Sequence, residues 1–389
     1  MNKKIKWPLI ENTVTVLDKL KMCYFLLTHT KYTNGPKVKK FEAAWAQWLG
    51  SRYALMTNSG SSANLILLSA VKEKYNLKNN DKVLVPACTW STNISPVIQL
   101  GFTPIFCDVN LTNFSFDIEH LQQLKKQHPD IKLIFVTHLL GFSADNAMYQ
   151  ELFPDAVILD DICESHGCLD SPNIKKGSNS TGATFSFYFG HHITTVEGGM
   201  IVTNDAELYD LMRMKRSHGM AREAVDSTVY NMQNPDIDPQ FLFVTDGYNL
   251  RSSELNAILG LSQLPRLDSV INIRRNNFSR FVEIIKLHPD KFYPIQWDPY
   301  NSNYSFPFIC KSPMIMGKIK QQFIDSGIEC RPIVGGNLLR QPFLKQYKFT
   351  VPKSNYTVDL INNNGFYIGN SQFITSKHLD FLENLLKSL

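Results

Sequence analysis

The alternation of short apolar runs with helix-like stretches between residues 50 and 205 constrains the fold of this chain more than any other feature. The apolar runs are rich in β-branched and aromatic residues: YALM, KVLVP, TPIFCDV, KLIFVTH and AVILDD. Stretches of helical pattern, such as ANLILLSAVKEKY, STNISPVIQLG (residues 91–101) and DIEHLQQLKKQ, separate them. Strands that are apolar on both faces and joined by helices predict a parallel sheet that is covered on both sides. We therefore expect an α/β fold.

A helix is predicted immediately before this region. In PKVKKFEAAWAQWLG, the residues Val38, Phe41, Trp45 and Trp48 recur at helical spacing, and Gly50 is a natural helix stop.

A second domain is predicted after the alternation ends near residue 247. A long helical stretch from roughly 268 to 287 leads into YPIQWDPYNSNYSFPF, which is rich in Pro and Asn, and then into single strands and helices. We predict a large domain over residues 1–269, with the N-terminal segment included, and a smaller α+β domain over 270–389.

Charge and cysteine usage exclude several classes of function. The formal net charge is only +5 and no long Lys/Arg block is present, which argues against nucleic-acid binding. The apolar runs are too short to cross a bilayer, and the positive residues of MNKKIKWPLIENT precede no apolar stretch. Seven scattered cysteines without a Cys-x-x-Cys pair favour a reducing compartment over disulfides or a zinc site. We expect a cytoplasmic protein without membrane or nucleic-acid partners.

Four polar segments follow predicted strands, where doubly wound sheets collect their ligands. NSGSSAN is a Gly/Ser turn that opens a helix, which suits a phosphate but also suits a simple N-cap. Trp90 follows KVLVP and either stacks on a planar ring or has a structural role. Asp160 and Asp161 end AVILDD, and Glu164 follows closely. Adjacent carboxylates repel each other and usually require a metal or another cation, but a metal would need more ligands than this segment offers. The alternative interpretation is an N-cap plus one solvated acid.

The fourth segment, ATFSFYFGHHITTVEGGMIVTND, contains two strand-like runs, TFSFYF and MIVT, and a histidine pair between them. It contains no lysine, and none occurs between Lys176 and Lys215. A phosphate turn, a stacking aromatic, an acid for a ring nitrogen and a base together match the needs of a pyridoxal-type cofactor.

At these motifs the sequence resembles the DegT/DnrJ/EryC1-type sugar aminotransferases, which have the aspartate-aminotransferase fold (fold type I) and act on nucleotide-linked keto sugars. The resemblance runs in order along nearly the whole chain. It includes TNGPKVKKFEAAWA, NSGSSANLILLSA, THLLGFSADNAMYQEL, LDDICESHG, FSFYFGHHITTVEGGMIVTND, RSHGM, GYNLRSSELNAILGLSQLPRL and GIECRPIVGGNLLRQPF.

One departure decides which branch the sequence resembles. The transaminases carry their Schiff-base lysine five residues after the Ser of the SF strand and seven before Gly-Gly, and His191 stands there in this chain. An imidazole cannot bind the cofactor covalently, but it can move protons. Lysine-to-histidine exchange is typical of the 3-dehydratases of nucleotide-linked 4-keto-6-deoxy sugars. The cysteines here lack the clustering of the iron–sulfur type, so the resemblance is to the iron-free type, which acts on a GDP-linked sugar.

The resemblance implies a reaction and a set of roles. L-Glutamate converts non-covalently bound pyridoxal phosphate (PLP) to pyridoxamine phosphate (PMP), whose amine condenses with the C4 ketone before the C3 hydroxyl is lost; the product is a precursor of colitose-type dideoxyhexoses. His191 is the base, and Asp161 contacts the ring nitrogen. The implied cofactor contacts are Ser61, Ser62 and Ser186 at the phosphate, Trp90 stacked on the ring, and Glu164 near the ring or its hydroxyl.

Further implied roles depend on a homodimer with shared sites. Asn249 would reach the cofactor of a partner, and Arg251 is a candidate for the same role. His218 is a candidate acid/base or substrate contact, and Arg331 a candidate for binding a substrate group or the glutamate carboxylate; both have a structural role as the alternative.

Two other interpretations stay open at this point. The first is an ordinary PLP aminotransferase, which would need a lysine at position 191. The second is a non-enzymatic scaffold, which should have lost several site residues at once. We also expect His191 and His192 to point to opposite sides of an extended segment, with His191 at the cofactor.

Overall fold

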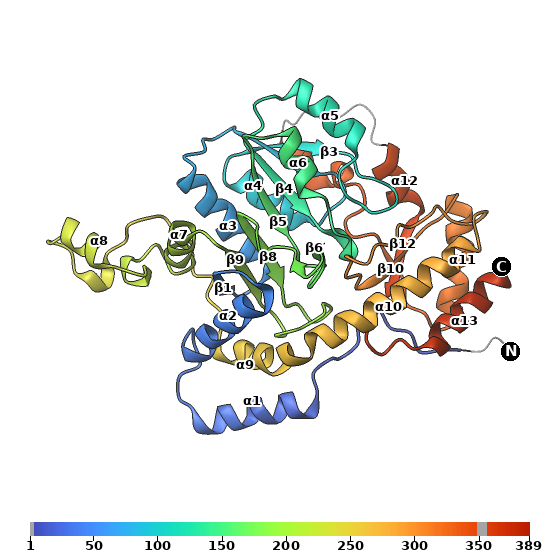
Figure 1. Cartoon of the computed structure of the whole chain (residues 1–389), viewed down its shortest axis with the longest axis horizontal. Coiled ribbons are helices and arrows are strands. Elements are labelled where there is room, and N and C mark those ends of the chain that lie inside the picture. The colour runs from blue at the N-terminus through green and yellow to red at the C-terminus, as the bar shows by residue number, and fades with distance from the viewer. Residues whose placement is uncertain (1–3, 348–355) are drawn as a thin grey trace.

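The computed structural model describes residues 4–347 and 356–389. A seven-stranded sheet with spatial order β1-β9-β8-β5-β4-β2-β3 forms its centre (Figure 1). All neighbouring strands pair in parallel except β9, which is antiparallel to both β1 and β8. The prediction of a mainly parallel α/β sheet is therefore confirmed. The strands are β1 (Tyr53–Thr57), β2 (Lys82–Pro86), β3 (Thr103–Cys107), β4 (Leu133–Thr137), β5 (Val157–Asp161), β8 (Gly182–Ser186) and β9 (Gly199–Thr203).

Helices cover both faces of this sheet because successive side chains of each strand point to opposite sides. In β1, Leu55 joins the core under one helical layer, whereas Met56 joins the core on the other face. The first layer contains α3 (Gly60–Lys74), α4 (Ser95–Gln99) and α7 (Ala206–Arg216). The second contains α2 (Pro36–Leu49), α5 (Ile118–Gln127), α6 (Asn146–Leu152) and α9 (Glu254–Gln263).

The predicted helix 38–48 is confirmed as part of α2. Gly50 follows it in the left-handed conformation with φ 91°, and its N–H closes the helix on the Ala46 carbonyl. The predicted long helix is confirmed as α10 (Leu267–Lys286).

Two boundary predictions were wrong. The stretch 91–101 forms a 3-10 turn, Ser91–Asn93, and only a short helix, α4, because Pro96 restricts helical continuation from the preceding turn. The strand expected over TFSFYF ends at Ser186, because the chain turns back after Phe187: the Phe187 carbonyl accepts the Thr195 N–H, and His191 N–H donates to Tyr188 O.

The C-terminal part is built on a three-stranded antiparallel sheet of order β10-β12-β11. These strands are β10 (Ser305–Ile309), β11 (Arg331–Pro332) and β12 (Gly365–Gly369). The helices α10, α11 (Pro313–Asp325), α12 (Tyr356–Asn364) and α13 (Ser376–Lys387) belong to the same part of the molecule, shown in yellow to red in Figure 1. A further two-stranded ribbon, β6 (Leu169–Ser171) with β7 (Ile174–Lys175), lies in the large domain.

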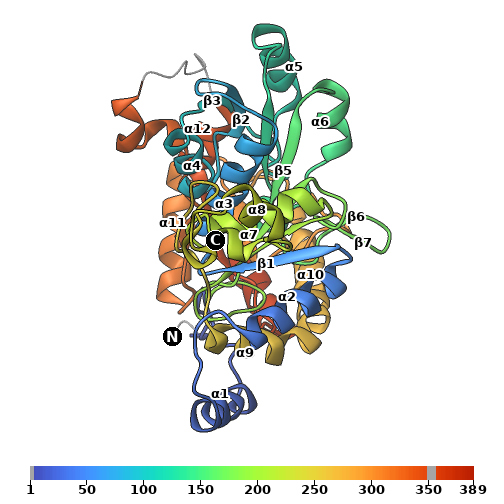
Figure 2. The same cartoon turned by 90° about the vertical axis from the view of Figure 1, so that its left-hand side faces the viewer.

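The N-terminal segment contacts the C-terminal part of the chain before it reaches the helices around the large sheet. Trp7 is fully buried in the core of the C-terminal part, pairs with Ile328 and donates its indole N–H to Gly369 O at 2.8 Å. The chain then crosses to α1 (Val16–Thr28), which lies beside α9 at one edge of the molecule (Figures 1 and 2).

A second projecting element is the arm 221–246, which carries α8 (Thr228–Gln233). Across the described parts of the chain, the search for membrane-spanning segments finds no helix with the length and apolarity that a bilayer crossing requires.

Candidate active site

A cavity of about 450 Å³ lies at the C-terminal ends of the parallel strands, where the C-terminal part of the chain closes over the sheet. Thr137, Asp161 and Ser186 contribute to it from the ends of β4, β5 and β8. The C-terminal part contributes Arg331 and Tyr367. The remaining lining residues that matter below are Leu9, Ile10, Ser59, Gly60, Ser61, Trp90, Asn93, Cys163, Glu164, Tyr188, His191, Glu197 and Tyr304.

The two adjacent carboxylates at the end of β5 point in opposite directions. Asp160 faces away from the cavity, where His138 Nε2 lies 2.9 Å from its carboxylate and Asn146 donates a further hydrogen bond. Asp161 faces the cavity and accepts hydrogen bonds from the amides of Asn64 at 2.8 Å and Asn93 at 2.7 Å. Strand alternation thus separates two charges that would repel each other on one side of the sheet.

Helix α3 begins at the cavity. Ser59 is its N-cap and accepts the Ser62 N–H at 3.1 Å. Gly60 packs so tightly that a Cβ there would lie 2.7 Å from Ser186 Cβ. The close approach requires glycine and brings the helix N-terminus, with its positive dipole end, next to the end of β8.

His191 lines the cavity from the turn that follows β8, whereas His192 is buried and bonds the Ser302 carbonyl at 3.0 Å. Our premise of an extended segment was wrong because residues 189–193 form a turn and bends, but the two side chains do diverge. Burial lowers the pKa of His191 to about 3, and the charge of Arg274 adds to the effect. The imidazole is therefore neutral near pH 7. Its Nδ1 is buried and has no hydrogen-bond partner among the described residues, which leaves Nε2 as the candidate nitrogen for proton transfer.

Glu164 forms another wall of the cavity. Its carboxylate accepts the Leu140 N–H at 2.8 Å and the Tyr304 hydroxyl at 3.2 Å. Burial raises the pKa of Glu164 to about 7, and the nearby Asp161 charge also raises it, against the lowering effect of its two hydrogen-bond donors.

The described residues fit a pyridoxal-type cofactor. Asp161 is buried, and within residues 4–347 and 356–389 no basic side chain forms an ion pair with it, so its charge suits a protonated ring nitrogen. The N-terminus of α3 with Ser61 and Ser186 suits a phosphate. Trp90 exposes 54% of its surface at the cavity and offers a face for stacking. Among the described residues no lysine lines the cavity.

Comparison with known proteins assigns this architecture to a family. The model of the DegT/DnrJ/EryC1/StrS aminotransferase family matches residues 17–367. The chain belongs to this family.

Several relatives are similar over nearly the full length. GDP-4-keto-6-deoxy-D-mannose 3-dehydratase of Escherichia coli O55:H7 is 34% identical, with 98% of this chain and 100% of the relative covered. The enzyme of that name from Yersinia pseudotuberculosis is also 34% identical, with 93% of each chain covered. A crystal structure of GDP-4-keto-6-deoxymannose-3-dehydratase with a trapped PLP–glutamate geminal diamine superimposes with a TM-score of 0.90 at 31% identity, covering 98% of this chain and 100% of the other.

Seven predicted site residues of this family member line one cavity: Ser61, Trp90, Asp161, Glu164, Ser186, His191 and Arg331. The cavity of the single chain does not include Ser62, His218, Asn249 or Arg251 among its described lining residues. His218 is exposed with φ 66°, and Asn249 is exposed beside it, because Ser217 and Asn249 form a bridge. Arg251 bridges to Thr57, just before the Gly/Ser turn.

Sequence reasoning missed four residues that shape the site: three line the cavity, and Asn64 supports Asp161 without lining it. Asn64 and Asn93, which hold Asp161, stand inside the motifs NSGSSAN and CTWSTN, so an amide facing a strand-end acid was the signal available. Tyr304 and Tyr367 come from the C-terminal part and belong to no motif that distinguishes them from core tyrosines.

Proposed function

We propose that this protein is a PLP/PMP-dependent 3-dehydratase that removes the C3 hydroxyl of a nucleotide-linked 4-keto-6-deoxyhexose, with L-glutamate as the amino donor that regenerates PMP. The observation that carries the proposal is the neutral imidazole of His191 in a cavity that has a carboxylate for a pyridinium and, among its described lining residues, no lysine. Such a site supports proton transfer without covalent attachment of the cofactor.

The relatives support the choice of substrate and amino donor. Two full-length relatives are named for a GDP-linked 4-keto-6-deoxymannose, and a structural neighbour was trapped with PLP and glutamate. We therefore take GDP-4-keto-6-deoxy-D-mannose as the substrate and a dideoxy keto sugar of the colitose pathway type as the product.

When bound, PMP supplies an amine for the C4 ketone and a ring that delocalises electrons. Asp161, held by Asn64 and Asn93, keeps the ring nitrogen protonated by accepting its hydrogen. Ser61, Ser62 and Ser186 with the N-terminus of α3 hold the phosphate, and Trp90 stacks on the ring. Glu164 lies beside the ring or its hydroxyl.

His191 and Arg331 act on the substrates. His191 accepts a proton at Nε2, for which its neutral form is required. Arg331 is exposed at the rim of the cavity and contacts a charged substrate group, the glutamate carboxylate being one candidate.

The assay that tests the function contains purified protein, PLP, L-glutamate and GDP-4-keto-6-deoxymannose, and a dTDP-linked sugar serves as a parallel substrate. Mass spectrometry and NMR then identify the product. Loss of the C3 oxygen supports dehydration. Nitrogen at C4 would establish an aminotransferase instead, and an unchanged sugar with no cofactor binding would establish a non-enzymatic scaffold.

The active form is a homodimer in this proposal. Helix α1 presents Leu17, Leu20, Tyr24 and Leu27 on one outer face, and Leu27 is 87% exposed. The arm 221–246 exposes Val229, Met232, Phe241 and Phe243. Apolar faces of this kind suit a second copy of the chain.

Such an arrangement gives a place to the predicted residues that lie outside the chain's own cavity. Asn249, Arg251 and His218 would then face the cavity of the partner. All seven cysteines are free, which suits the cytoplasm as the location.

A further inference from the structure

We propose that Glu164 is the acid that protonates the departing C3 hydroxyl, so that acid and base are two different residues on two walls of the cavity. This inference rests on the proposed dehydration and adds a catalytic residue to it. In the proposed function, Glu164 has no more than a contact with the cofactor ring.

The position of the carboxyl group is fixed by groups from two other segments of the chain. Leu140 N–H holds one oxygen at 2.8 Å, and the Tyr304 hydroxyl holds the other at 3.2 Å. Leu140 adopts a left-handed conformation with φ 53°, which is uncommon for a leucine, and this turn directs its N–H at the carboxylate. A strained turn that supports a cavity-lining acid is typical of a functional site.

Glu164 is not neutralised by a cation. Within the described residues, no basic side chain forms an ion pair with it, and the groups around it are Asp161, Tyr304, Tyr367, Cys88, Cys163 and Leu140. Asp161 is a like charge, and the thiols and phenols are neutral near pH 7 because burial raises the pKa of each of them. These surroundings favour the protonated carboxyl, which is the form that can donate a proton.

A second set of contacts connects the carboxyl group to the rim of the cavity. Tyr304 packs edge-on against Tyr367, with ring centroids 6.1 Å apart, and Tyr367 and Arg331 both line the cavity. Tyr304 also packs edge-on against His191, with ring centroids 5.8 Å apart. The acid and the base therefore flank one tyrosine.

The division of labour follows from the opposite protonation of the two groups. His191 is neutral and accepts a proton, but at neutral pH it is not in the imidazolium form that readily donates one at the start of the reaction. Hydroxide is a poor leaving group, so the C3 oxygen needs a proton as its bond breaks. Glu164 gives that proton to the oxygen, and the C3–O bond breaks with its electron pair on oxygen.

Water leaves in this step, and Glu164 becomes a carboxylate. The electron pair that replaces the broken bond comes from the C–H bond whose proton His191 accepts, so charge and atoms balance. A later proton transfer from His191 to Glu164 restores the starting forms.

The first test measures the pKa of the Glu164 carboxyl group in the cofactor-free protein. NMR of protein labelled with L-[5-¹³C]glutamate, with the signal assigned by its loss in Glu164→Gln, should show this carboxyl titrating near pH 7. A glutamate in water titrates near pH 4.3. Titration below about pH 5 would overturn the proposal, since the group would then hold no proton at neutral pH.

The second test separates the two half-reactions. In Glu164→Gln, dehydration should fall about 100-fold or more, the usual range for loss of a general acid, whereas the conversion of PLP to PMP by L-glutamate, followed by absorbance, should stay within a few-fold. The wild-type dehydration rate should decline above about pH 7, and this decline should vanish in Glu164→Gln. Glu164→Asp should recover part of the rate.

Glu151→Gln is the control variant. It changes an exposed position on α6 and should leave both half-reactions unchanged. Dehydration at the wild-type rate in Glu164→Gln would overturn the proposal, as would equal loss of both half-reactions. If the wild type forms an amino sugar, the proposed function fails, and the NMR titration still decides whether Glu164 carries a proton at neutral pH.

Discussion

In the proposed function, position 191 determines whether the cofactor can be bound covalently. Position 191 holds an imidazole that lines the cavity, and no described lysine lines it. The neighbouring His192 cannot substitute for it, because its ring is buried against Ser302. Reactivity at this position is therefore decided by one side chain whose neutral form is enforced by burial.

Exchange of His191 for lysine should restore covalent attachment. Borohydride should leave the cofactor free from the wild-type protein but fix it to His191→Lys, which mass spectrometry of the intact chain detects. Dehydration should fall at least about 100-fold, because the general base is lost. His192→Lys is the matched control and should show no adduct. An adduct in the wild type would mean that another lysine reaches the cofactor.

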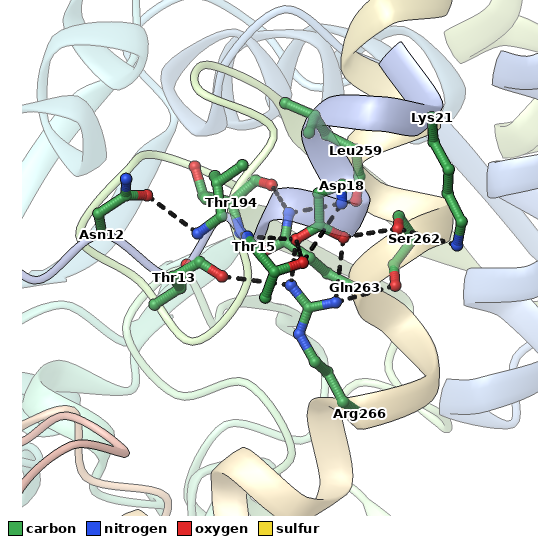
Figure 3. Close-up of polar contacts among 11 residues, drawn as sticks. Asn12, Thr13, Thr15, Asp18, Lys21, Thr194, Leu259, Ser262, Gln263 and Arg266 are labelled. Atoms are coloured by element: carbon green, nitrogen blue, oxygen red, sulfur yellow. Dashed lines mark hydrogen bonds and ion pairs between the residues drawn. The ribbon is translucent and has the colours of Figure 1, made fainter. Parts of the chain in front are cut away.

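At the scale of elements, the docking of α1 depends on one buried carboxylate. Asp18 completes a capping box with Thr15 at the start of α1. Its carboxylate also accepts hydrogen bonds from the two terminal guanidinium nitrogens of Arg266, Nη2 at 2.6 Å and Nη1 at 3.1 Å (Figure 3). Ser262 on α9 donates to the same carboxylate, and Lys21 donates to Ser262 at 3.0 Å. One acid thus caps its own helix and attaches it to the next.

Asp18→Asn should destabilise the protein by about 1–3 kcal/mol at pH 7. This range allows for solvent screening of the ion pair, because the Arg266 side chain is partly exposed. Hydrogen bonds from Arg266, Ser262 and Thr15 outweigh the effect of burial and hold the pKa of Asp18 well below its usual range. A group whose pKa is lowered on folding stabilises the fold fully above its unfolded-state pKa of about 4, and this contribution is lost progressively as pH falls from there towards the folded-state pKa. The difference in urea midpoint between variant and wild type should therefore shrink towards pH 3, and the exposed Asp155→Asn should show no such difference at either pH.

The turn that supports Glu164 allows a second test on an element. Gly141 has φ 93°, and a Cβ there would lie 2.2 Å from Asn303 Cα. Gly141→Ala should lower the free energy of unfolding by about 2–4 kcal/mol, because both backbone strain and a backbone clash result. Gly317→Ala in α11 meets nothing within 4 Å and should be neutral or stabilising by up to about 1 kcal/mol. Equal urea midpoints for the two variants would contradict this account.

The elements that sequence predicts well are those with a local signal. Helix α2 is defined by its apolar spacing and Gly50, and β5 by an unbroken apolar run. The end of β8 has no such signal, because the turn after Phe187 is fixed by residues that lie beyond it in the chain: the Thr195 N–H donates to the Phe187 carbonyl, and the Gly198 carbonyl accepts the Phe187 N–H.

The same reasoning holds for the site. Strand ends and the Gly/Ser turn could be predicted because the sheet places them together. Tyr304 and Tyr367 could not, since they reach the cavity only through packing of the C-terminal part against the large sheet. His218, Asn249 and Arg251 are not among the described lining residues of their own chain's cavity, so their predicted roles depend on the proposed dimer.

At the scale of the whole molecule, the apolar face of α1 predicts the assembly. Leu20→Glu combined with Leu27→Glu places two charges on this face and should weaken the dimer at least about 100-fold, because charges are depleted at interface cores. Sedimentation equilibrium should give twice the chain mass of 44.4 kDa for the wild type and the chain mass for the variant.

Leu287 provides the control. It is exposed, but it belongs neither to the apolar face of α1 nor to the arm 221–246. Leu287→Glu should leave the dimer intact. A wild-type protein that sediments as a monomer at micromolar concentration, or a double variant with unchanged mass, would contradict this assembly.

The packing of the N-terminal segment, which contains Trp7, Leu9 and Ile10, affects the order in which the chain can fold during synthesis. Trp7 is synthesised 362 residues before its partner Gly369, and its partner Ile328 also follows much later in the chain. Leu9 and Ile10, which line the cavity, are likewise made long before that part of the chain. The part that contains the seven-stranded sheet can assemble as it emerges, but the cavity stays incomplete until β12 is made. Ligand binding by a nascent chain should thus begin only after β12 has left the ribosome.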